Sequence, residues 1–460
     1  MATSSVLPPG RVRRAGTLLL LAFLATAGGM LAARAIPARA SVRPLSVASD
    51  EVLAHYRGTP GTRRVSVPAG GSVAGTLSRL RSDSAVGYAR PDYLVRAAEA
   101  VFWPNDPGPG GRGHWYRDQW NLLPPTRVVG GIGMPGGWQR LVADGRPGAK
   151  GVTVAVLDTG VAYRNKGRRF RRDPDLPRTR HFVHPKDLVD GDRLPLDRQG
   201  HGTHVASTIA QATDNGLGLT GIAYGVRVMP IRVLNRHEVG KGSDVARGIR
   251  FATAHGADVI NLSLDFKPNV KHCEQIVSVC HAIQHAIHEG AIVVAAAGND
   301  DMSRASYPAA ADGVIAVGAS TYRGCAADYS NYGKGVNLVA PGGGQDRAPQ
   351  ATGDASCTPS GEGYEIRQYS LLPGPAKHGN FRKFGITGLE GTSMSAAHVS
   401  GVAATVIASR VCGKHPSPRR VARRLKSTAV DRGAPGRDDL YGDGLLDASR
   451  AISPRTPCGR

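Results

Sequence analysis

The stretch 151-GVTVAVLDTG-160 is an unbroken apolar run that ends in an aspartate. Similar runs follow at 226–234, 257–264, 291–299 and 312–320, and helical patterns separate several of them. Continuous apolar strands are typical of parallel sheets that are buried on both faces. The sequence therefore predicts an α/β fold with a doubly wound parallel sheet. In such sheets, ligands bind at the carboxyl ends of the strands.

Four polar residues stand at the predicted ends of these elements. Asp158 closes the first strand, and Asn299 follows the fourth in "AAAGN". His201 begins a helix in "RQGHGTHVASTIAQA", and Ser393 begins another after "LEGT". Each alone has an ordinary explanation, such as a helix cap. Together they supply a nucleophile, a base for its proton and a carboxylate for the base, which predicts nucleophilic catalysis.

The motifs around these residues resemble, in order, the signature blocks of the subtilase family of serine peptidases. They are "VAVLDTGV", "GHGTHVA", "INLSL", "VVAAAGN", "YSNYG", "VAPGG", "GTSMSAAHVSGV" and the closing "YGDGLLDASRA". The resemblance covers about residues 103–452 and implies a subtilisin-like three-layer fold. It implies a serine endopeptidase in which Ser393 forms the acyl-enzyme, His201 is the base and Asp158 orients His201. Asn299 and the Ser393 N–H would bind the oxyanion.

The same resemblance implies which residues bind a protein or peptide substrate. They are Ser263, Leu264, Asp265, Glu238, Val239, Gly240, Ala297 and Gly298. Asp265 stands where the family usually has glycine; it either favours basic substrate side chains or points to solvent, so the specificity stays open. Ala397 replaces the usual proline of the serine block, and His398 is expected to be a packed structural histidine. Activity should rise as His201 loses its proton, near its unperturbed pKa of about 6.5–7.

The N-terminus predicts export. Arg11, Arg13 and Arg14 precede the apolar run 15–33, and the small residues of "ARA" end at Ala40. This layout is typical of a secretory signal peptide over 1–40, with a permanent membrane anchor as the alternative. We expect a secreted protein without a stable membrane anchor.

Residues 41–102 predict a small α+β domain, with strands in 63–70 and 85–95 around a helix in 71–83. It resembles the inhibitory propeptide of subtilases, which implies self-cleavage between Val95 and Trp103; a permanent domain is the alternative. The peptidase domain would then span 103–455, before a short tail at 456–460.

Calcium is the cofactor that the resemblance implies, in the thermitase-like branch. The ligands would be Asp106, Asp175, Thr213, Asn215, Leu217 and Leu219. Oxygen ligands of mixed type suit Ca²⁺. The alternative is a glycine turn beside solvated carboxylates. The acids Asp187, Asp190 and Asp192 could form another cation site.

The formal charge of +22 over 460 residues raises the question of polyanion binding. The arginines are spread along the chain and do not alternate with aromatic residues, which favours a basic soluble monomer over a nucleic-acid-binding protein. Six cysteines in an exported chain predict disulfides, with Cys273–Cys280 and Cys412–Cys458 as candidate pairs. Other functions compatible with the sequence are an inactive binding protein on this scaffold and a protease dedicated to one partner.

Overall fold

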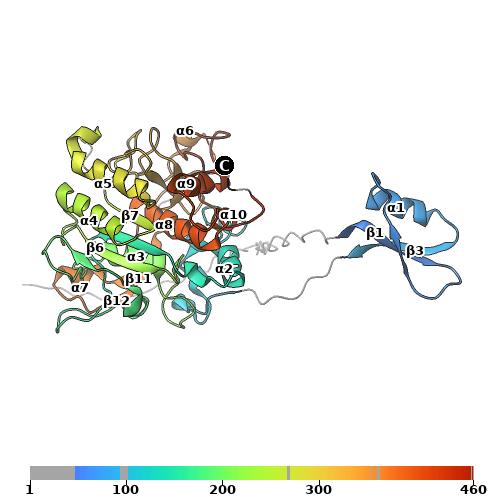
Figure 1. Cartoon of the computed structure of the whole chain (residues 1–460), viewed down its shortest axis with the longest axis horizontal. Coiled ribbons are helices and arrows are strands. Elements are labelled where there is room, and N and C mark those ends of the chain that lie inside the picture. Colours follow the sequence, from blue (N-terminus) through green and yellow to red (C-terminus); the bar gives the residue numbers. More distant parts are fainter. Residues whose placement is uncertain are drawn as a thin grey trace, which may run out of the picture. The chain divides into compact units, whose positions relative to one another are not determined.

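The computed structural model describes residues 47–93, 102–266, 270–353, 355–359, 363–456 and 458. These residues form two compact units, which are described separately (Figure 1). The predicted signal peptide and residues 95–101 of the predicted self-cleavage segment lie outside the described residues. Within them, no helix is both apolar enough and long enough to span a bilayer.

The first unit is a three-stranded antiparallel sheet with one helix. Its elements are β1 (Val47–Tyr56), β2 (Arg63–Ser66), α1 (Val73–Arg81) and β3 (Val86–Tyr93), and the strand order is β2-β1-β3. Leu77 and Leu80 of α1 share a core with Val52 and Ala54 of β1. The two predicted strands and the helix are confirmed. The sequence did not predict β1, because only Val52 and Ala54 of its ten residues are buried.

The second unit is built on a seven-stranded parallel sheet. In spatial order the strands are β10 (Leu338–Pro341), β9 (Ile315–Ser320), β8 (Ile292–Ala296), β7 (Val259–Leu262), β4 (Thr153–Asp158), β6 (Arg227–Arg232) and β5 (Lys186–Asp187). The five predicted apolar runs form β4 and β6–β9, which confirms the doubly wound parallel sheet. The short edge strands β5 and β10 were not predicted as strands.

Helices cover both faces of this sheet and make three layers (Figure 1). Val154 and Val156 of β4 face a core shared with α2 (Met134–Ala143), α3 (His201–Ala210), α8 (Thr392–Ser409), α9 (Pro418–Thr428) and α10 (Ala448–Ala451). Ala155 and Leu157 face the opposite core, with α4 (Gly242–Ala254) and α5 (Val277–His288). Alternate residues of a strand point to opposite faces, so a strand buried on both sides is apolar throughout.

The remaining elements lie around this sheet. They are the hairpin of β11 (Ile366–Leu371) and β12 (Phe384–Leu389), the short helices α6 (Pro349–Thr352) and α7 (Pro373–Lys377), and the 3-10 turns η1 (Gly108–Gly110), η2 (Trp115–Arg117), η3 (Trp120–Leu122), η4 (Pro147–Ala149), η5 (Thr179–His181) and η6 (Cys273–Ile276). Disulfides join Cys273 to Cys280, Cys325 to Cys357 and Cys412 to Cys458. The two predicted pairings are therefore confirmed.

Candidate active site

The parallel sheet brings the four predicted catalytic residues to one region. Asp158 is the last residue of β4, Asn299 follows β8, and His201 and Ser393 stand at the N-termini of α3 and α8. His201, Asn299 and Ser393 line a cleft of about 690 Å³. Asp158 lies buried behind His201. Segments far apart in sequence thus converge because the carboxyl ends of parallel strands meet at one edge.

A short hydrogen bond joins the histidine to the aspartate. His201 Nδ1 donates to Asp158 Oδ1 at 2.8 Å, and the same oxygen accepts the N–H of Thr159 at 2.7 Å. Gly202 permits this close packing, because a Cβ on it would lie 2.2 Å from the Gly160 oxygen. With Nδ1 protonated and bound to Asp158, Nε2 is the basic nitrogen of His201.

Burial disfavours the charged form of His201, but neighbouring carboxylates outweigh it. The charge of Asp158 and its hydrogen bond, with smaller effects of Glu238 and Asp197, raise the pKa of His201 to about 9. The expectation from the unperturbed value, a transition near pH 6.5–7, is therefore corrected upward, because isolated imidazole has no such carboxylate partner.

Ser393 is held against the segment that follows β7. Ser263 Oγ donates to the Ser393 carbonyl at 2.8 Å, and Ser393 Oγ donates to the Ser263 carbonyl at a longer 3.3 Å. Among the described residues, no hydrogen bond joins Ser393 to His201. Catalytic hydrogen bonds are often loose in ligand-free structures and tighten when substrate binds, so this geometry is compatible with nucleophilic catalysis.

Thr392 sets the orientation of the Asn299 amide. Asn299 Oδ1 accepts the N–H and the hydroxyl of Thr392, each at 2.9 Å. The carbonyl half of the amide is thus occupied, and no acceptor for the NH₂ half is found among the described residues; Asn299 lines the same cleft as Ser393. An oxyanion hole requires such a donor.

The predicted substrate segments lie mostly where they were expected. Seven of the eight predicted substrate-binding residues line the cleft, namely Ser263, Leu264, Asp265, Glu238, Val239, Gly240 and Gly298. Ala297 does not: it is fully buried, its carbonyl accepts bonds from Ser306 and Asn331, and Ala296 lines the cleft instead. Neighbouring residues of an extended chain face opposite ways, so Ala297 points into the core while Ala296 lines the cleft.

Comparison with known proteins agrees with this geometry. A model of the Subtilase family matches residues 149–444. The chain belongs to the subtilase family. It is 33% identical over 334 residues to the thermophilic serine proteinase of Bacillus sp. (strain AK1), a match that covers 73% of this chain and 66% of that protein. It is 34% identical over 303 residues to Subtilisin BL of Lederbergia lenta, covering 65% and 90%.

A solved structure supports the same assignment. A protease from Pseudoalteromonas arctica PAMC 21717 superimposes with a TM-score of 0.60 and 29% identity, over 76% of this subtilase and 99% of that chain. The subtilisin-like α/β fold is therefore established.

His398 of this subtilase is a packed structural residue, as predicted. It is fully buried, its Nδ1 donates to the Met394 carbonyl at 2.8 Å, and its Nε2 accepts from Asn121 Nδ2 at 2.7 Å. Burial lowers the pKa of His398 to about 4. A histidine held neutral with both nitrogens occupied is not a second base.

The predicted calcium ligands gather around a loop of the subtilase. Asp175 accepts Asn215 Nδ2 at 2.8 Å and the Leu219 N–H at 2.9 Å. Asp106 accepts the N–H groups of Asp214 and Asn215 at 2.9 and 3.2 Å. Thr213 and Leu217 belong to the same loop, where Leu217 N–H donates to Asn215 Oδ1 at 2.7 Å.

The chemistry of this loop fits a hard cation. Burial raises the pKa of Asp175 to about 9 and that of Asp106 to about 6, and the two carboxylates repel each other. Gly218 leaves space beside them, since a Cβ there would lie 2.1 Å from Asp175 Oδ2. In the described part of the chain, no cluster of three His, Cys, Asp or Glu side chains could hold a metal, so a cation at this loop would take its further ligands from amide and carbonyl oxygens.

At the suggested cation site of Asp187, Asp190 and Asp192, an arginine side chain takes the place of a metal ion. Arg232, itself buried, pairs with Asp187 at 2.8 Å and with Asp190 at 2.9 Å. Asp192 Oδ1 accepts the Leu194 N–H at 2.6 Å. An arginine in a parallel strand neutralises two of these acids, and no local feature of the sequence predicts that pairing.

Sequence reasoning missed a buried aspartate that holds the histidine helix. Asp197 accepts the N–H groups of Gln199, Gly200 and Thr203 at 2.8–2.9 Å and the Thr159 hydroxyl at 3.0 Å. It therefore links the end of β4 to the start of α3, on which Asp158 and His201 stand. The one feature of the sequence that could have indicated this role is the position of the aspartate, four residues before the histidine in "DRQGH".

Proposed function

We propose that this subtilase is a secreted serine endopeptidase that is matured by removal of its propeptide. The observation that carries the proposal is the 2.8 Å Asp158–His201 hydrogen bond beside a cleft that Ser393 and Asn299 also line. Its relatives support peptidase activity, since their names are those of serine proteinases and subtilisins.

The residues would divide the reaction between them. Ser393 Oγ attacks the scissile carbonyl while His201 Nε2 takes the hydroxyl proton, and the Ser393–carbonyl bond forms as the peptide π bond opens. The Asn299 NH₂ and the Ser393 N–H stabilise the oxyanion. His201 then donates the proton to the leaving amine, and water releases the acyl group by the same route. Asp158 keeps the imidazole in the required tautomer.

An inactive binding scaffold is the alternative. Two features of the site argue against it: Thr392 orients the Asn299 amide, and the buried carboxylate of Asp158 holds the His201 ring. Burying a carboxylate is costly, and a site for binding alone gains nothing from that cost.

The direct test is labelling of the secreted protein with a fluorophosphonate probe. We expect labelling and peptide hydrolysis in the native protein and neither in Ser393→Ala. Ser409→Ala, at the other end of α8, is the matched control and should behave as wild type. Labelling that persists in Ser393→Ala would contradict the proposal.

The raised pKa of His201 predicts an alkaline pH profile. The base must be neutral, so kcat/KM should rise with pH and reach half its plateau near pH 9, about the pKa of His201. Initial rates across about pH 5 to pH 11 on an uncharged peptide test this. A half-maximum at or below about pH 6.5 would show that the carboxylates do not raise the pKa.

The first unit is proposed to be the inhibitory propeptide, with export directed by the N-terminal segment. Its fold, a three-stranded sheet with a helix, is compatible with such a role. N-terminal sequencing of the secreted enzyme tests this: a start between Val95 and Trp103 is expected, and a start before Asp92 would contradict it.

Calcium is proposed as a structural ion held by Asp106, Asp175, Asn215 and the carbonyls of Thr213, Leu217 and Leu219. When bound, it would supply positive charge to two buried carboxylates that otherwise repel each other. Thermal unfolding with and without a chelator tests whether the loop depends on the ion.

A further inference from the structure

A second cavity, of about 760 Å³, lies next to the catalytic cleft, and its walls are basic. We call it the basic groove and define it by six of its lining residues: Arg169, Arg198, Arg236, Lys377, Phe170 and Phe381. Among the described residues, its lining contains no aspartate or glutamate. The proposed peptidase mechanism uses none of these side chains.

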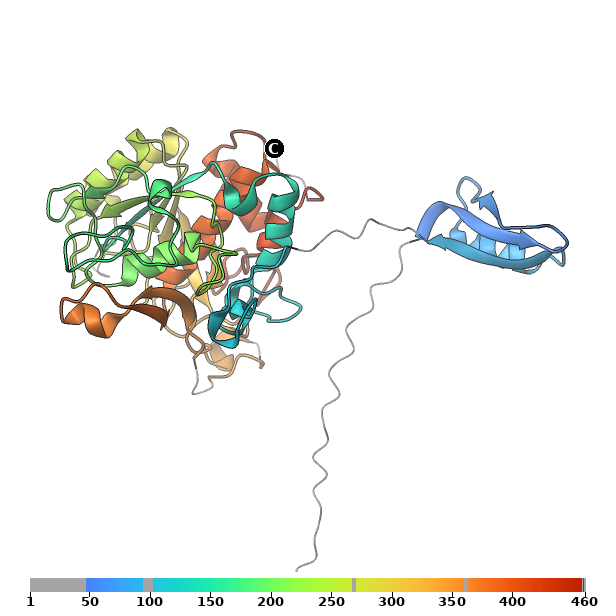
Figure 2. The ribbon, with the colours of Figure 1, turned by 90° about the horizontal axis from the view of Figure 1, so that it is seen from below.

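Two loops that are distant in sequence join to form the groove. The rings of Phe170 and Phe381 stack with centroids 4.8 Å apart and planes 12° apart. The N–H of Arg171 donates to the Phe381 carbonyl at 3.0 Å, which fixes the two backbones together. Phe381 follows α7 in the sequence. Together with β11 and β12, α7 forms a segment at the periphery of the second unit, coloured orange in Figure 2. The groove is therefore a built feature of the fold rather than a chance gap between mobile side chains.

The aromatic rings also position two of the cations. The Arg169 guanidinium lies 5.8 Å from the Phe381 ring centroid, and that of Arg198 lies 6.0 Å from the Phe170 ring. Such contacts attract a cation without cancelling its charge. Arg198 pairs with Asp190 at 2.6 Å, but in the described part of the chain no carboxylate pairs with Arg169, Arg236 or Lys377. At least three exposed cations thus remain available to an anionic ligand.

The groove and the catalytic cleft share a wall. His237 lines both, and Arg236 Nε donates to His237 Nε2 at 3.0 Å. Gln199, which also lines the groove, accepts the His201 N–H at 2.5 Å and donates to Glu238 at 2.7 Å. A polypeptide lying in the cleft against His201 and Glu238 can therefore continue into the groove.

The two cavities have opposite charge. Four carboxylates line the cleft, those of Glu238, Asp265, Asp300 and Glu390. Acidic substrate residues next to the scissile bond would be repelled there, whereas acidic residues a few positions away would meet the groove. One residue of extended chain spans roughly 3.3 Å, so a spacer of three or four residues reaches about 10–13 Å.

We propose that the basic groove binds an acidic segment of the polypeptide substrate, separated from the scissile bond by a short spacer. This inference rests on the proposed peptidase function and assigns its substrate class: chains that carry a run of Asp or Glu near, but not at, the cleaved bond. A free polyanion that binds without affecting cleavage is the competing occupant.

The test uses mature enzyme and matched quenched fluorescent peptides. One peptide carries a run of three glutamates after a four-residue neutral spacer, placed in turn on each side of the cleaved bond; its partner carries glutamines. Because exposed ion pairs are weak, we expect kcat/KM for the glutamate peptide to be roughly 5- to 20-fold higher on one side, mainly through KM. The preference should fall as salt is added.

Variants separate the groove from the general positive charge of the protein. Arg236→Gln/Lys377→Gln should reduce the glutamate-to-glutamine ratio to near 1. Lys414→Gln/Arg419→Gln removes the same charge from exposed positions outside the groove and should keep the ratio. A wild-type ratio near 1, or a ratio that survives Arg236→Gln/Lys377→Gln, overturns the proposal. If neither peptide is cleaved and the fluorophosphonate does not label the protein, it is the peptidase function that has failed.

Discussion

The two ends of the second unit are fastened by opposite charges. Near its N-terminal end, buried carboxylates accept hydrogen bonds from backbone N–H groups of the loop 213–219. Near its C-terminal end, the buried guanidinium of Arg424 donates to backbone carbonyls of the segment 450–456. The first arrangement brings together acidic side chains that form no salt bridge among the described residues, whereas the second is completed by the chain itself.

At the N-terminal end, Asp106 and Asn105 attach the chain to the loop. Asp106 accepts two N–H groups of the loop, and Asn105 Oδ1 accepts the Gly216 N–H at 2.7 Å. The N–H of Gly108 donates to the Gly218 carbonyl at 2.9 Å. Asp175 lies beside these contacts, so the attachment brings like charges together.

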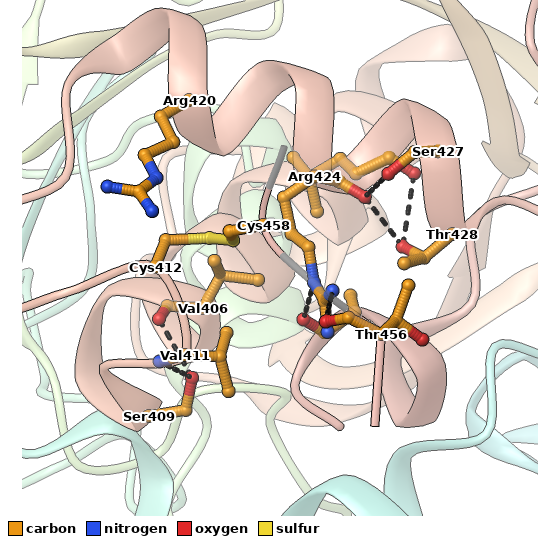
Figure 3. The surroundings of a disulfide bond; sticks show 12 residues. Val406, Ser409, Val411, Cys412, Arg420, Arg424, Ser427, Thr428, Thr456 and Cys458 are labelled. Carbon is orange, nitrogen blue, oxygen red and sulfur yellow. Dashed lines mark hydrogen bonds between the residues drawn. A yellow bond between two sulfur atoms is a disulfide. The ribbon is translucent and has the colours of Figure 1, made fainter. Parts of the chain in front are cut away.

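At the C-terminal end, one arginine gathers four carbonyls. Arg424 donates to the carbonyls of Ala451 at 2.6 Å, Arg450 at 3.0 Å and Ser453 at 2.5 Å. It also donates to the carbonyl of Thr456, which lies near it in Figure 3. No carboxylate pairs with it in the described part of the chain, and burial lowers the pKa of its guanidinium. The Cys412–Cys458 disulfide closes the same segment (Figure 3).

The two ends differ in what completes them: Arg424 completes the C-terminal end, whereas the proposed calcium ion would complete the N-terminal end. Buried carboxyl groups that repel each other either hold protons, as the raised pKa values of Asp175 and Asp106 indicate, or are neutralised by a cation, which makes that end responsive to its surroundings. An arginine surrounded by carbonyls satisfies its donors internally and needs no ion. The two ends should therefore respond to different treatments.

The largest effect should come from removing the proposed calcium ion. For an ion present at a thousand times its dissociation constant, chelation costs about 4 kcal/mol of unfolding free energy. Thermal melts of active-site-blocked mature enzyme with and without chelator test this. Asp175→Asn should lower the melting midpoint in calcium and remove most of the response to chelator. A midpoint that chelator does not move would show that the N-terminal end is complete without an ion.

The second-largest effect should come from removing the charge of Arg424. Arg424→Met keeps much of the side-chain volume but leaves four carbonyls without their donor, and we expect it to lower the unfolding free energy by about 3 kcal/mol. The loss should be the same with and without chelator. Arg420→Met, in the same helix, is the matched control, because no hydrogen bond of the Arg420 side chain is found among the described residues; it should cost less than about 1 kcal/mol. Equal losses in both variants would contradict the role of the carbonyl contacts.

The sequence was most informative where one physical rule acts over many residues. The apolar runs of β4 and β6–β9 follow from burial of a parallel sheet, so the fold could be predicted. The meeting of Asp158, His201, Asn299 and Ser393 in one region could be predicted too, because they stand at the ends of elements in that sheet. The contacts of Asp197, Arg232 and Arg424 could not, because each joins residues that only the folded chain brings together. The burial of Ala297 between Ala296 and Gly298, which both line the cleft, could not be predicted either, since local backbone direction, not residue type, decides which neighbour faces the cleft.

The smallest effect should be a loss of folding stability on acidification, caused by His398. His398 ties Asn121 of the N-terminal segment to α8, and its pKa is lowered from 6.5 to about 4. The folded state thus favours neutral His398, so its contribution to stability is fully present above about pH 6.5 and is lost as the pH falls toward 4. From about pH 7 to about pH 5.5 the loss should be about 1 kcal/mol.

Urea unfolding of blocked enzyme in saturating calcium at these two pH values measures the loss. His398→Gln should be less stable than wild type at neutral pH but should lose about 1 kcal/mol less on acidification. His288→Gln, which changes an exposed histidine, should keep the wild-type difference. If His398→Gln also keeps the wild-type difference in unfolding free energy, then His398 is not held neutral by the fold. The attachment of Asn121 to α8 would then be as independent of pH as the carbonyl contacts of Arg424.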